Sequence, residues 1–351
     1  MYLFAAITIA PFPIGLTSPS NIASISSSSL NLLFNIFIFL IFEKYISMDI
    51  YKLFGFTMGG INTKQINYRK YNTELIMQGT YLLDPAFIDI WDIELDELNE
   101  NKIGQPFKYP TSMIKYCVIL HAKRFTFRQI QGVLITISKL TCGFSVPSFS
   151  QIRRRILHFK FNFMQNAQNL EVAVDGSGMK PATRGDWIRK KWKVKRGWIK
   201  VVAIGDTKGN IIDIVVGEET LNEQEVAREL IEKYSQKIAV VYLDGLHDTK
   251  KTFELCEKHK IKAVIKIRKN ASSKGLNSRS RAVKDYLERG YDNWKEHHKY
   301  GRRWLASEGI FSAEKRTFGE SVAAKKQENQ FFEVKLKFWA YQHLRQLASA
   351  V

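Results

Sequence analysis

The chain has 351 residues, of which 45% are hydrophobic and 13% aromatic, so it can bury a core and form two or three domains. This composition excludes a disordered chain. The formal net charge of +19 makes nucleic acid the first expected partner and an anionic membrane surface the second. Cys117, Cys142 and Cys256 lack the paired spacing of zinc or redox sites, and we expect buried, reduced thiols.

The first 47 residues differ in composition from the rest of the chain. No charged side chain precedes Glu43, and residues 30–42 form an apolar run. This run is shorter than the roughly 18 to 20 residues that span a bilayer, and no Lys or Arg precedes it as in a signal peptide. We therefore favour a natural start at Met48 over a membrane anchor, with the earlier residues coming from an over-extended reading frame.

Residues 48–168 are expected to form a helical region, with helices at 112–122, 126–138 and 148–163. Two of these helices have strong start signals. Thr126 is followed by Gln129, and Ser148 by Gln151, which is the spacing of a capping box.

The last two helices fit a helix–turn–helix whose second helix meets DNA, because it carries Arg153, Arg154 and Arg155. At most two of three consecutive arginines share a helix face, so we predict DNA contact by Arg153 and Arg154, to phosphates rather than bases. The alternative is an ordinary helical pair with a solvated basic face.

From about residue 170 the pattern changes to an α/β domain, assigned to residues 169–351. The segments EVAVDGSG, GWIKVVAIGD, IIDIVVGEE, KIAVVYLDG and AVIKIRK are rich in Val and Ile and are predicted to be strands. Helices are expected at 222–234 and 249–259. Strands that first follow one another and then alternate with helices indicate a mixed sheet covered on both faces.

Two of these strands are each predicted to end in an Asp-Gly pair, at Asp175 and Asp244. If the strands are neighbours, the two carboxylates meet at one edge of the sheet, where open α/β folds bind ligands. Like charges that close need a cation between them, and oxygen ligands suit Mg²⁺ or Mn²⁺. The alternative is that each pair is an ordinary turn.

A later segment, YGRRWLASEGIFSAEKRTFGES, places Tyr300, Arg303, Glu308 and Lys315 in a characteristic order. Together with VAVDGSGMK and VYLDGLHDTK, it resembles the three catalytic boxes of DDE transposases from bacterial and archaeal insertion sequences. The third box of that family has three residues between its Arg and its Glu. Here four residues separate Arg303 from Glu308.

The resemblance implies a ribonuclease-H-like catalytic domain in which Asp175, Asp244 and Glu308 hold two Mg²⁺ or Mn²⁺ ions for DNA strand cleavage and strand transfer. Tyr300, Arg303 and Lys315 would contact DNA. Glu314 and Glu320 are the competitors for the third position. Glu308 and Glu314 fall on different faces of a helix, so only one of these two can point into the site.

The run DWIRKKWKVKRGWIK interleaves basic residues with tryptophans and is predicted to contact the DNA backbone through Arg189, Lys190, Lys191 and Lys193. Alternation in a strand, with tryptophans facing the core, is the alternative. A second basic set is assigned to a DNA-facing insertion: Lys266, Arg268, Lys269, Lys274, Arg279 and Arg281. His247 and His259 are interpreted as solvated or capping residues rather than metal ligands.

We therefore expect a cytoplasmic, nucleoid-associated protein that acts on double-stranded DNA as a homodimer. Three rivals stand beside this hypothesis. One is another ribonuclease-H-like nuclease such as a junction resolvase. The second is an inactive, domesticated transposase that only binds DNA, and the third is a membrane-associated basic protein.

Overall fold

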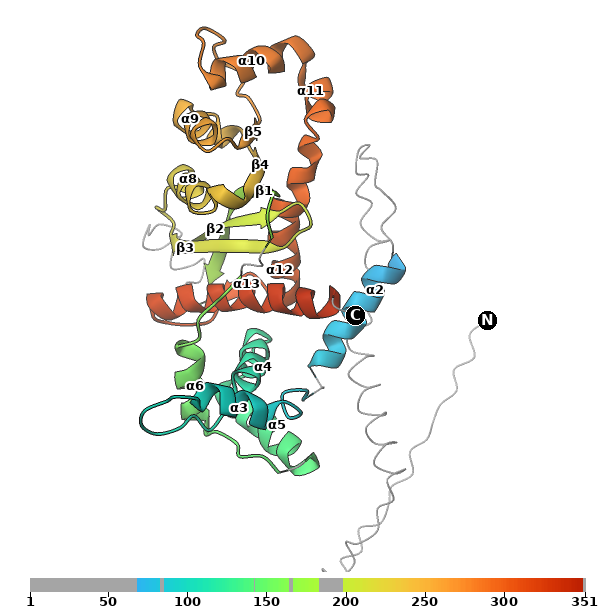
Figure 1. Cartoon of the computed structure of the whole chain (residues 1–351), viewed down its shortest axis with the longest axis vertical. Helices are drawn as coiled ribbons and strands as arrows, with labels where there is room; N and C mark the ends of the chain where they lie inside the picture. The colour runs from blue at the N-terminus through green and yellow to red at the C-terminus, as the bar shows by residue number, and fades with distance from the viewer. Residues whose placement is uncertain (1–67, 83–84, 142, 164–166, 183–197, 350–351) are drawn as a thin grey trace, which may run out of the picture. The chain divides into compact units, whose positions relative to one another are not determined.

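The computed structural model describes residues 68–82, 85–141, 143–163, 167–182 and 198–349 (Figure 1). The predictions on the first 47 residues and on the basic run at 189–193 lie outside these ranges. The chain from Asn67 to Val351 forms one compact unit. Within the described ranges, no helix has the length and apolarity that a membrane span needs.

The first part of this unit is helical, as predicted. Its helices are α2 (Tyr68–Tyr81), α3 (Trp91–Asn99), α4 (Thr111–Ala122), α5 (Phe127–Leu140) and α6 (Phe149–Leu157). Both predicted capping boxes are present, at the starts of α5 and α6. These two helices contact each other and α4, which is compatible with a helix–turn–helix.

Helix α6 is shorter than predicted and ends at Leu157 instead of residue 163. The following residues are not helical, and they place every second side chain against the core. The ring of Phe159 packs 4.7 Å from Trp339, and that of Phe161 packs 5.0 Å from Phe332. Contacts with a distant helix therefore override the local helical pattern.

The second part is built on a mixed sheet in the order β3-β2-β1-β4-β5. Its strands are β1 (Leu170–Pro181), β2 (Ile199–Asp206), β3 (Ile211–Glu218), β4 (Ile238–Leu243) and β5 (Lys262–Ile265), and the short β6 (Ser321–Val322) pairs with β1. The first three strands are antiparallel, and β4 and β5 join them in parallel. This confirms the predicted α/β, ribonuclease-H-like architecture.

Helices cover both faces of the sheet (Figure 1). Val202 and Ile204 of β2 pack in one core with α8 (Glu223–Lys233) and α9 (Lys250–Lys258). Val201 and Ala203 pack in the other core with α12 (Ile310–Phe318) and α13 (Gln327–Ser349). The alternation of side chains along β2 thus supplies both cores. Two further helices, α10 (Ser278–Arg289) and α11 (Tyr291–His297), follow β5.

Helix α13 ties the helical region to the sheet, because it contacts α2 and α4 as well as β3. One hydrophobic core accordingly runs from α4 to β2. Cys117 and Cys256 are free and buried, as expected, and burial raises the pKa of each thiol to about 12.

Candidate active site

Asp175 lies inside β1 rather than at its end. The prediction that this strand ends at Asp175 is wrong, since β1 continues to Pro181. The physical reason is β2, which pairs with β1 as far as Met179 and keeps the strand extended through Gly176 and Gly178. The β1–β4 pairing, by contrast, stops at Ala173, so Asp175 lies where β1 separates from β4.

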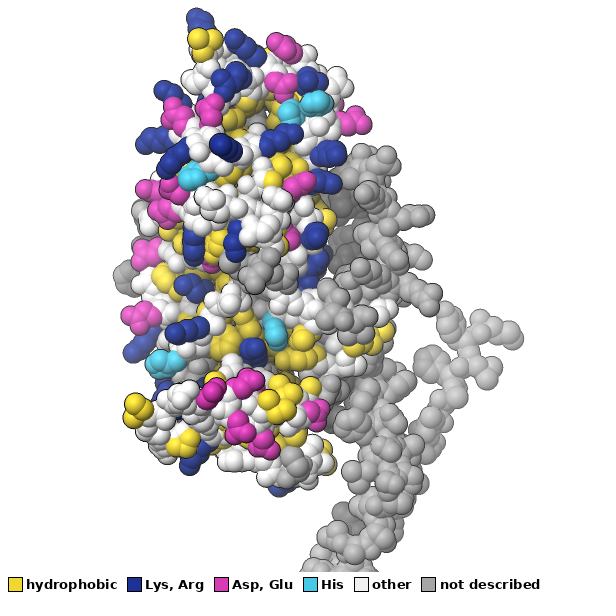
Figure 2. Space-filling model, in the orientation of Figure 1, with side chains coloured by type: hydrophobic (Ala, Val, Ile, Leu, Met, Phe, Trp, Pro, Cys, Tyr) yellow, Lys and Arg dark blue, Asp and Glu magenta, His cyan; other side chains and the backbone are white. Residues whose placement is uncertain are grey.

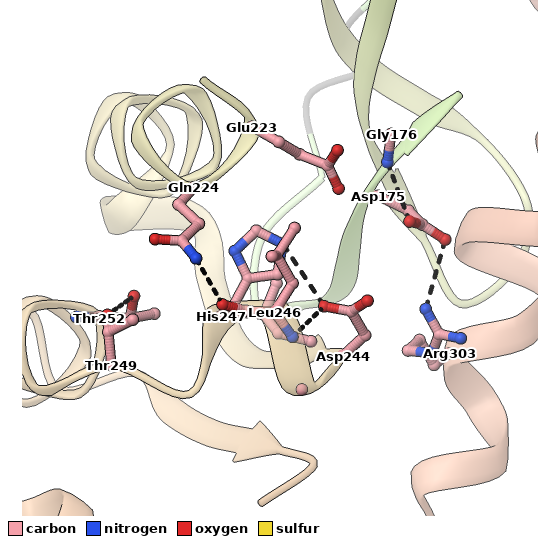
Figure 3. A network of polar contacts seen from close by, with 12 residues as sticks. Asp175, Gly176, Glu223, Gln224, Asp244, Leu246, His247, Thr249, Thr252 and Arg303 are labelled. Atoms are coloured by element: carbon pink, nitrogen blue, oxygen red, sulfur yellow. Dashed lines mark hydrogen bonds and ion pairs between the residues drawn. The ribbon is translucent and has the colours of Figure 1, made fainter. Parts of the chain in front are cut away.

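Asp244 directly follows β4 and opens the short 3-10 helix Gly245–His247. Its Oδ1 accepts a hydrogen bond of 2.9 Å from the amide of Leu246. Ala173 pairs with Tyr242, so Asp175 and Asp244 each stand two residues beyond the last pair of the two parallel strands. The two carboxylates lie near each other in Figure 3.

The turn after Asp244 is held by side chains from three other segments. Arg268 donates hydrogen bonds of 2.6 and 2.7 Å to the carbonyls of Gly245 and Leu246, and Gln224 donates one of 2.8 Å to Leu246. Asp248, with a fully buried side chain, binds Arg279 at 2.6 Å. Arg268 and Arg279, assigned from sequence to a DNA-facing insertion, thus form contacts within the protein that fix the position of Asp244.

The segment that resembles the third box forms one helical stretch over residues 300–318. This stretch brings Arg303 and Glu308 to the site. The guanidinium of Arg303 lies 3.3 Å from Asp175 Oδ2 and 2.9 Å from Glu308 Oε1. In an α-helix, side chains five residues apart point in different directions. Here the segment Leu305–Gly309 is π-helical, and the wider turn sets Arg303 and Glu308 on one side. The extra residue between them is therefore absorbed by a π-turn.

The charges around Asp175 act in opposite directions. Burial raises the pKa of Asp175, and the negative charges of Asp244 and Glu223 raise it further, whereas Arg303 and the amide of Gly176 lower it. A second cation beside these carboxylates would favour their ionised form. The site therefore has a surplus of negative charge that Arg303 offsets in part.

Tyr300 and Lys315 flank the carboxylates from two sides. Tyr300 is 7% exposed, and its hydroxyl donates a 3.1 Å hydrogen bond to the carbonyl of Leu243, next to Asp244. Lys315 donates a 2.8 Å hydrogen bond to Ser177, two residues after Asp175. Tyr300 thus supports the end of β4, and Lys315 brings a positive charge beside β1.

Glu308 and Glu314 point to different surroundings. The side chain of Glu308 is 56% exposed and paired with Arg303, whereas Glu314 is fully buried near Lys337 of α13. Burial raises the pKa of Glu314 to about 7. This arrangement favours Glu308 as the third acidic residue.

Sequence reasoning missed two residues beside the site, Glu223 and His247. Glu223 begins α8, where it carries only the signature of a helix start. His247 was expected to be solvated or capping, which is wrong, because it is 1% exposed. No local pattern in the sequence predicts the burial of this side chain. His259 is the C-cap residue of α9, in line with expectation.

The predicted DNA-contacting residues have different settings. Arg153 and Arg154 are exposed on α6, while Arg155 stacks on Tyr109 at 5.0 Å. Trp198 lies against Gly178, where a β-carbon would approach its ring to 2.5 Å, so this tryptophan packs on the sheet. Figure 2 shows lysines and arginines spread over the visible face rather than gathered in one patch.

The donor chemistry of Asp175, Asp244 and Glu308 fits a hard divalent cation, because all three offer carboxylate oxygens. Within the described residues, no three His, Cys, Asp or Glu side chains are close enough to hold an ion as they stand. The guanidinium of Arg303 lies between Asp175 and Glu308 and provides the positive charge there.

Comparison with protein-family models gives two matches, both to a transposase DDE domain, over residues 167–342 and 77–184. The chain belongs to the DDE transposase family. The first match includes Asp175, Asp244 and Glu308. The second begins within α2 and ends just after β1, so the helical region of this transposase also has counterparts in the family. Members of the family act on DNA and generally use divalent metals.

Proposed function

We propose that this transposase cuts the DNA ends of an insertion sequence and joins them to target DNA, using Asp175, Asp244 and Glu308 to hold two Mg²⁺ or Mn²⁺ ions. The observation that carries the proposal is the meeting of Asp175 and Asp244 at one sheet edge, with Arg303 linking Asp175 to Glu308.

When bound, the divalent ions supply activation of a water or 3′-hydroxyl and stabilisation of the leaving oxygen. The protein holds the reacting groups in place. Arg303 and Lys315 lie beside the carboxylates and can bind the phosphates that flank the scissile bond. Tyr300 binds the carbonyl of Leu243 at the end of β4 and so positions Asp244.

Further DNA contacts are proposed outside the carboxylate site. Arg153 and Arg154 are exposed on α6, the second helix of the predicted helix–turn–helix, as a DNA-contacting helix requires. The basic residues between β1 and β2 are proposed to follow the DNA backbone: Arg189, Lys190, Lys191 and Lys193. We propose that residues 48–168 serve DNA binding and assembly, that 169–351 serve catalysis, and that a homodimer acts at the nucleoid in the cytoplasm.

Two rival functions remain distinguishable by experiment. A ribonuclease-H-like nuclease that only cleaves would share the carboxylates and lack strand transfer. A domesticated DNA-binding descendant would bind DNA without cutting it. The third-box residues Arg303, Glu308 and Lys315, all placed around Asp175, favour the transposase.

The proposal is tested with Asp175→Asn, Asp244→Asn and Glu308→Gln, each measured for Mg²⁺-dependent cleavage and strand transfer of the element's end DNA. Each variant should lose both reactions and keep its affinity for that DNA, because the amide removes a metal ligand and little else. Glu314→Gln is the matched control and should stay active. Robust cleavage by Glu308→Gln with loss in Glu314→Gln would contradict the assignment.

A further inference from the structure

A fourth carboxylate lies against the predicted metal centre. Glu223, the first residue of α8, extends its side chain over Gly176, the neighbour of Asp175 (Figure 3). A β-carbon at Gly176 would lie 2.5 Å from Oε2 of Glu223, so the carboxylate occupies space that only glycine leaves free. In Figure 3, Glu223 and Arg303 lie on opposite sides of Asp175.

Glu223 pairs with a lysine on one side and faces a second carboxylate on the other. Its carboxylate pairs with Lys200 at 3.1 Å and is 15% exposed. Lys200 shares its ammonium with the carbonyl of Leu221, at 3.2 Å. On the other side Glu223 faces Asp175, whose pKa it helps to raise. Two acidic groups thus approach each other, with Lys200 beside Glu223 and Arg303 beside Asp175 as compensating charges.

An independent observation at the same place is the buried imidazole of His247. Its side chain is 1% exposed, and neither ring nitrogen forms a hydrogen bond within the described structure. Its Nε2 lies 3.8 Å from Asp244 Oδ1, and the charges of both Asp244 and Glu223 act on it. A buried polar group without a hydrogen bond is costly, which points to a polar ligand that binds beside Asp244 and Glu223.

We propose that Glu223 is a fourth carboxylate ligand of the divalent-cation centre, shared with Asp175 and Asp244, and that the bound cation with its water completes the surroundings of His247. This inference rests on the proposed function. The alternative is that Glu223 only pairs with Lys200 and stabilises the N-terminus of α8.

The test is a titration of the full-length protein with Mn²⁺, in which electron paramagnetic resonance measures the concentration of the free ion. Glu223→Gln should weaken Mn²⁺ binding at least about tenfold, the loss typical of a residue that supports a metal site. Glu225→Gln is the matched control, because it removes the same charge from an exposed position two residues along α8. It should change the affinity by less than about twofold, as expected for a screened surface charge.

Lys200→Met separates the two explanations. If Glu223 binds the cation, removal of the competing ammonium leaves Mn²⁺ affinity unchanged or increases it. If Lys200→Met weakens binding as much as Glu223→Gln does, the ion pair is the cause and the inference is overturned. Gly176→Ala provides a second route if Glu223→Gln fails to fold, because the new methyl group displaces the carboxylate and should also weaken binding.

Asp175→Asn distinguishes failure of this inference from failure of the proposed function. Loss of Mn²⁺ in Asp175→Asn, with wild-type affinity in Glu223→Gln, overturns the fourth ligand alone. Equal Mn²⁺ retention by the wild type, Asp175→Asn and Glu223→Gln overturns both proposals. A higher Mn²⁺ concentration for half-maximal cleavage by Glu223→Gln is the second supporting readout.

Discussion

Among single residues, Arg303 connects two separate parts of the candidate active site. Its planar guanidinium contacts two carboxylates at once, Asp175 and Glu308. A lysine offers a single ammonium and lacks this forked geometry. Arg303 also lies over the ring of Tyr300, at 5.8 Å, which restricts its position. The arginine therefore links the sheet edge to the helix that carries Glu308.

Glu314 has a pH-dependent effect on stability that is separate from catalysis. Burial raises its pKa from 4.5 to about 7, against the opposing charges of Lys337 and Lys315. The folded protein binds this proton more tightly than the unfolded chain, so the contribution is fully present below pH 4.5 and lost as pH rises through 7. The loss is at most on the order of 3 kcal/mol.

We predict that Glu314→Gln reduces the fall in stability between pH 5 and 7, as measured by urea unfolding at several pH values. The comparison must be between variants, because burial lowers the pKa of His343 to about 4, which acts with the opposite sign in the same range. The His343 contribution cancels in the difference. Identical pH profiles for wild type and Glu314→Gln would contradict the prediction.

Among the secondary-structure elements, the π-helical segment Leu305–Gly309 sets Arg303 and Glu308 on one side of the helix. The segment packs closely on β2 at Gly205, where a β-carbon would lie 2.6 Å from the backbone carbonyl oxygen of Ala306 and 2.4 Å from Ile310 Cδ1. Glycine is thus required for the close approach of this helix to the sheet. A shift of this helix away from β2 would move Glu308 relative to Asp175.

Gly205→Ala should therefore destabilise the protein by roughly 1–3 kcal/mol, the usual cost of overpacking, and lower the cleavage rate by moving Glu308. Urea unfolding and cleavage of end DNA measure the two effects. Gly132→Ala in α5 is the matched control, since no atom lies within 4 Å of the added carbon, and it should be neutral or slightly stabilising. Equal effects of the two substitutions would show that the contact at Gly205 is not limiting.

For the whole molecule, the net charge of +19 attracts the transposase to the negatively charged DNA backbone. Each phosphate that a protein cation neutralises releases counterions, so the affinity falls steeply with salt. The two regions proposed to contact DNA differ in their position in the chain and in the contacts expected of them. Arg153 and Arg154 lie exposed on a capped helix, while Lys190, Lys191 and Lys193 belong to the run between β1 and β2.

If Arg153 and Arg154 lie in a groove of the DNA, replacing both by alanine should reduce the preference for the element's end sequence, whereas replacing Lys190, Lys191 and Lys193 should weaken binding to all DNA about equally. Each lost duplex contact should make the logarithmic salt slope shallower by roughly 0.9. Binding of end DNA and random DNA at several salt concentrations measures both effects. Unchanged slopes in both variants would place the contacts elsewhere.

Features that depend on neighbouring residues could be predicted from the amino-acid sequence. The capping boxes at Thr126 and Ser148 and the Val- and Ile-rich strands are local patterns, and the structure confirms them. The family resemblance rested on three short motifs and is confirmed by the family match. The expectation that Asp175 and Asp244 meet required only that their strands be parallel neighbours, which they are.

Features that depend on distant partners could not be predicted in this way and follow from the fold. β1 continues past Asp175 because β2 pairs with it, and α6 stops early because Phe159 packs on Trp339. The π-turn between Arg303 and Glu308 lies where the helix packs against Gly205 of β2. Burial and ladder pairing are properties of the folded surroundings, so no reading of adjacent residues could supply them.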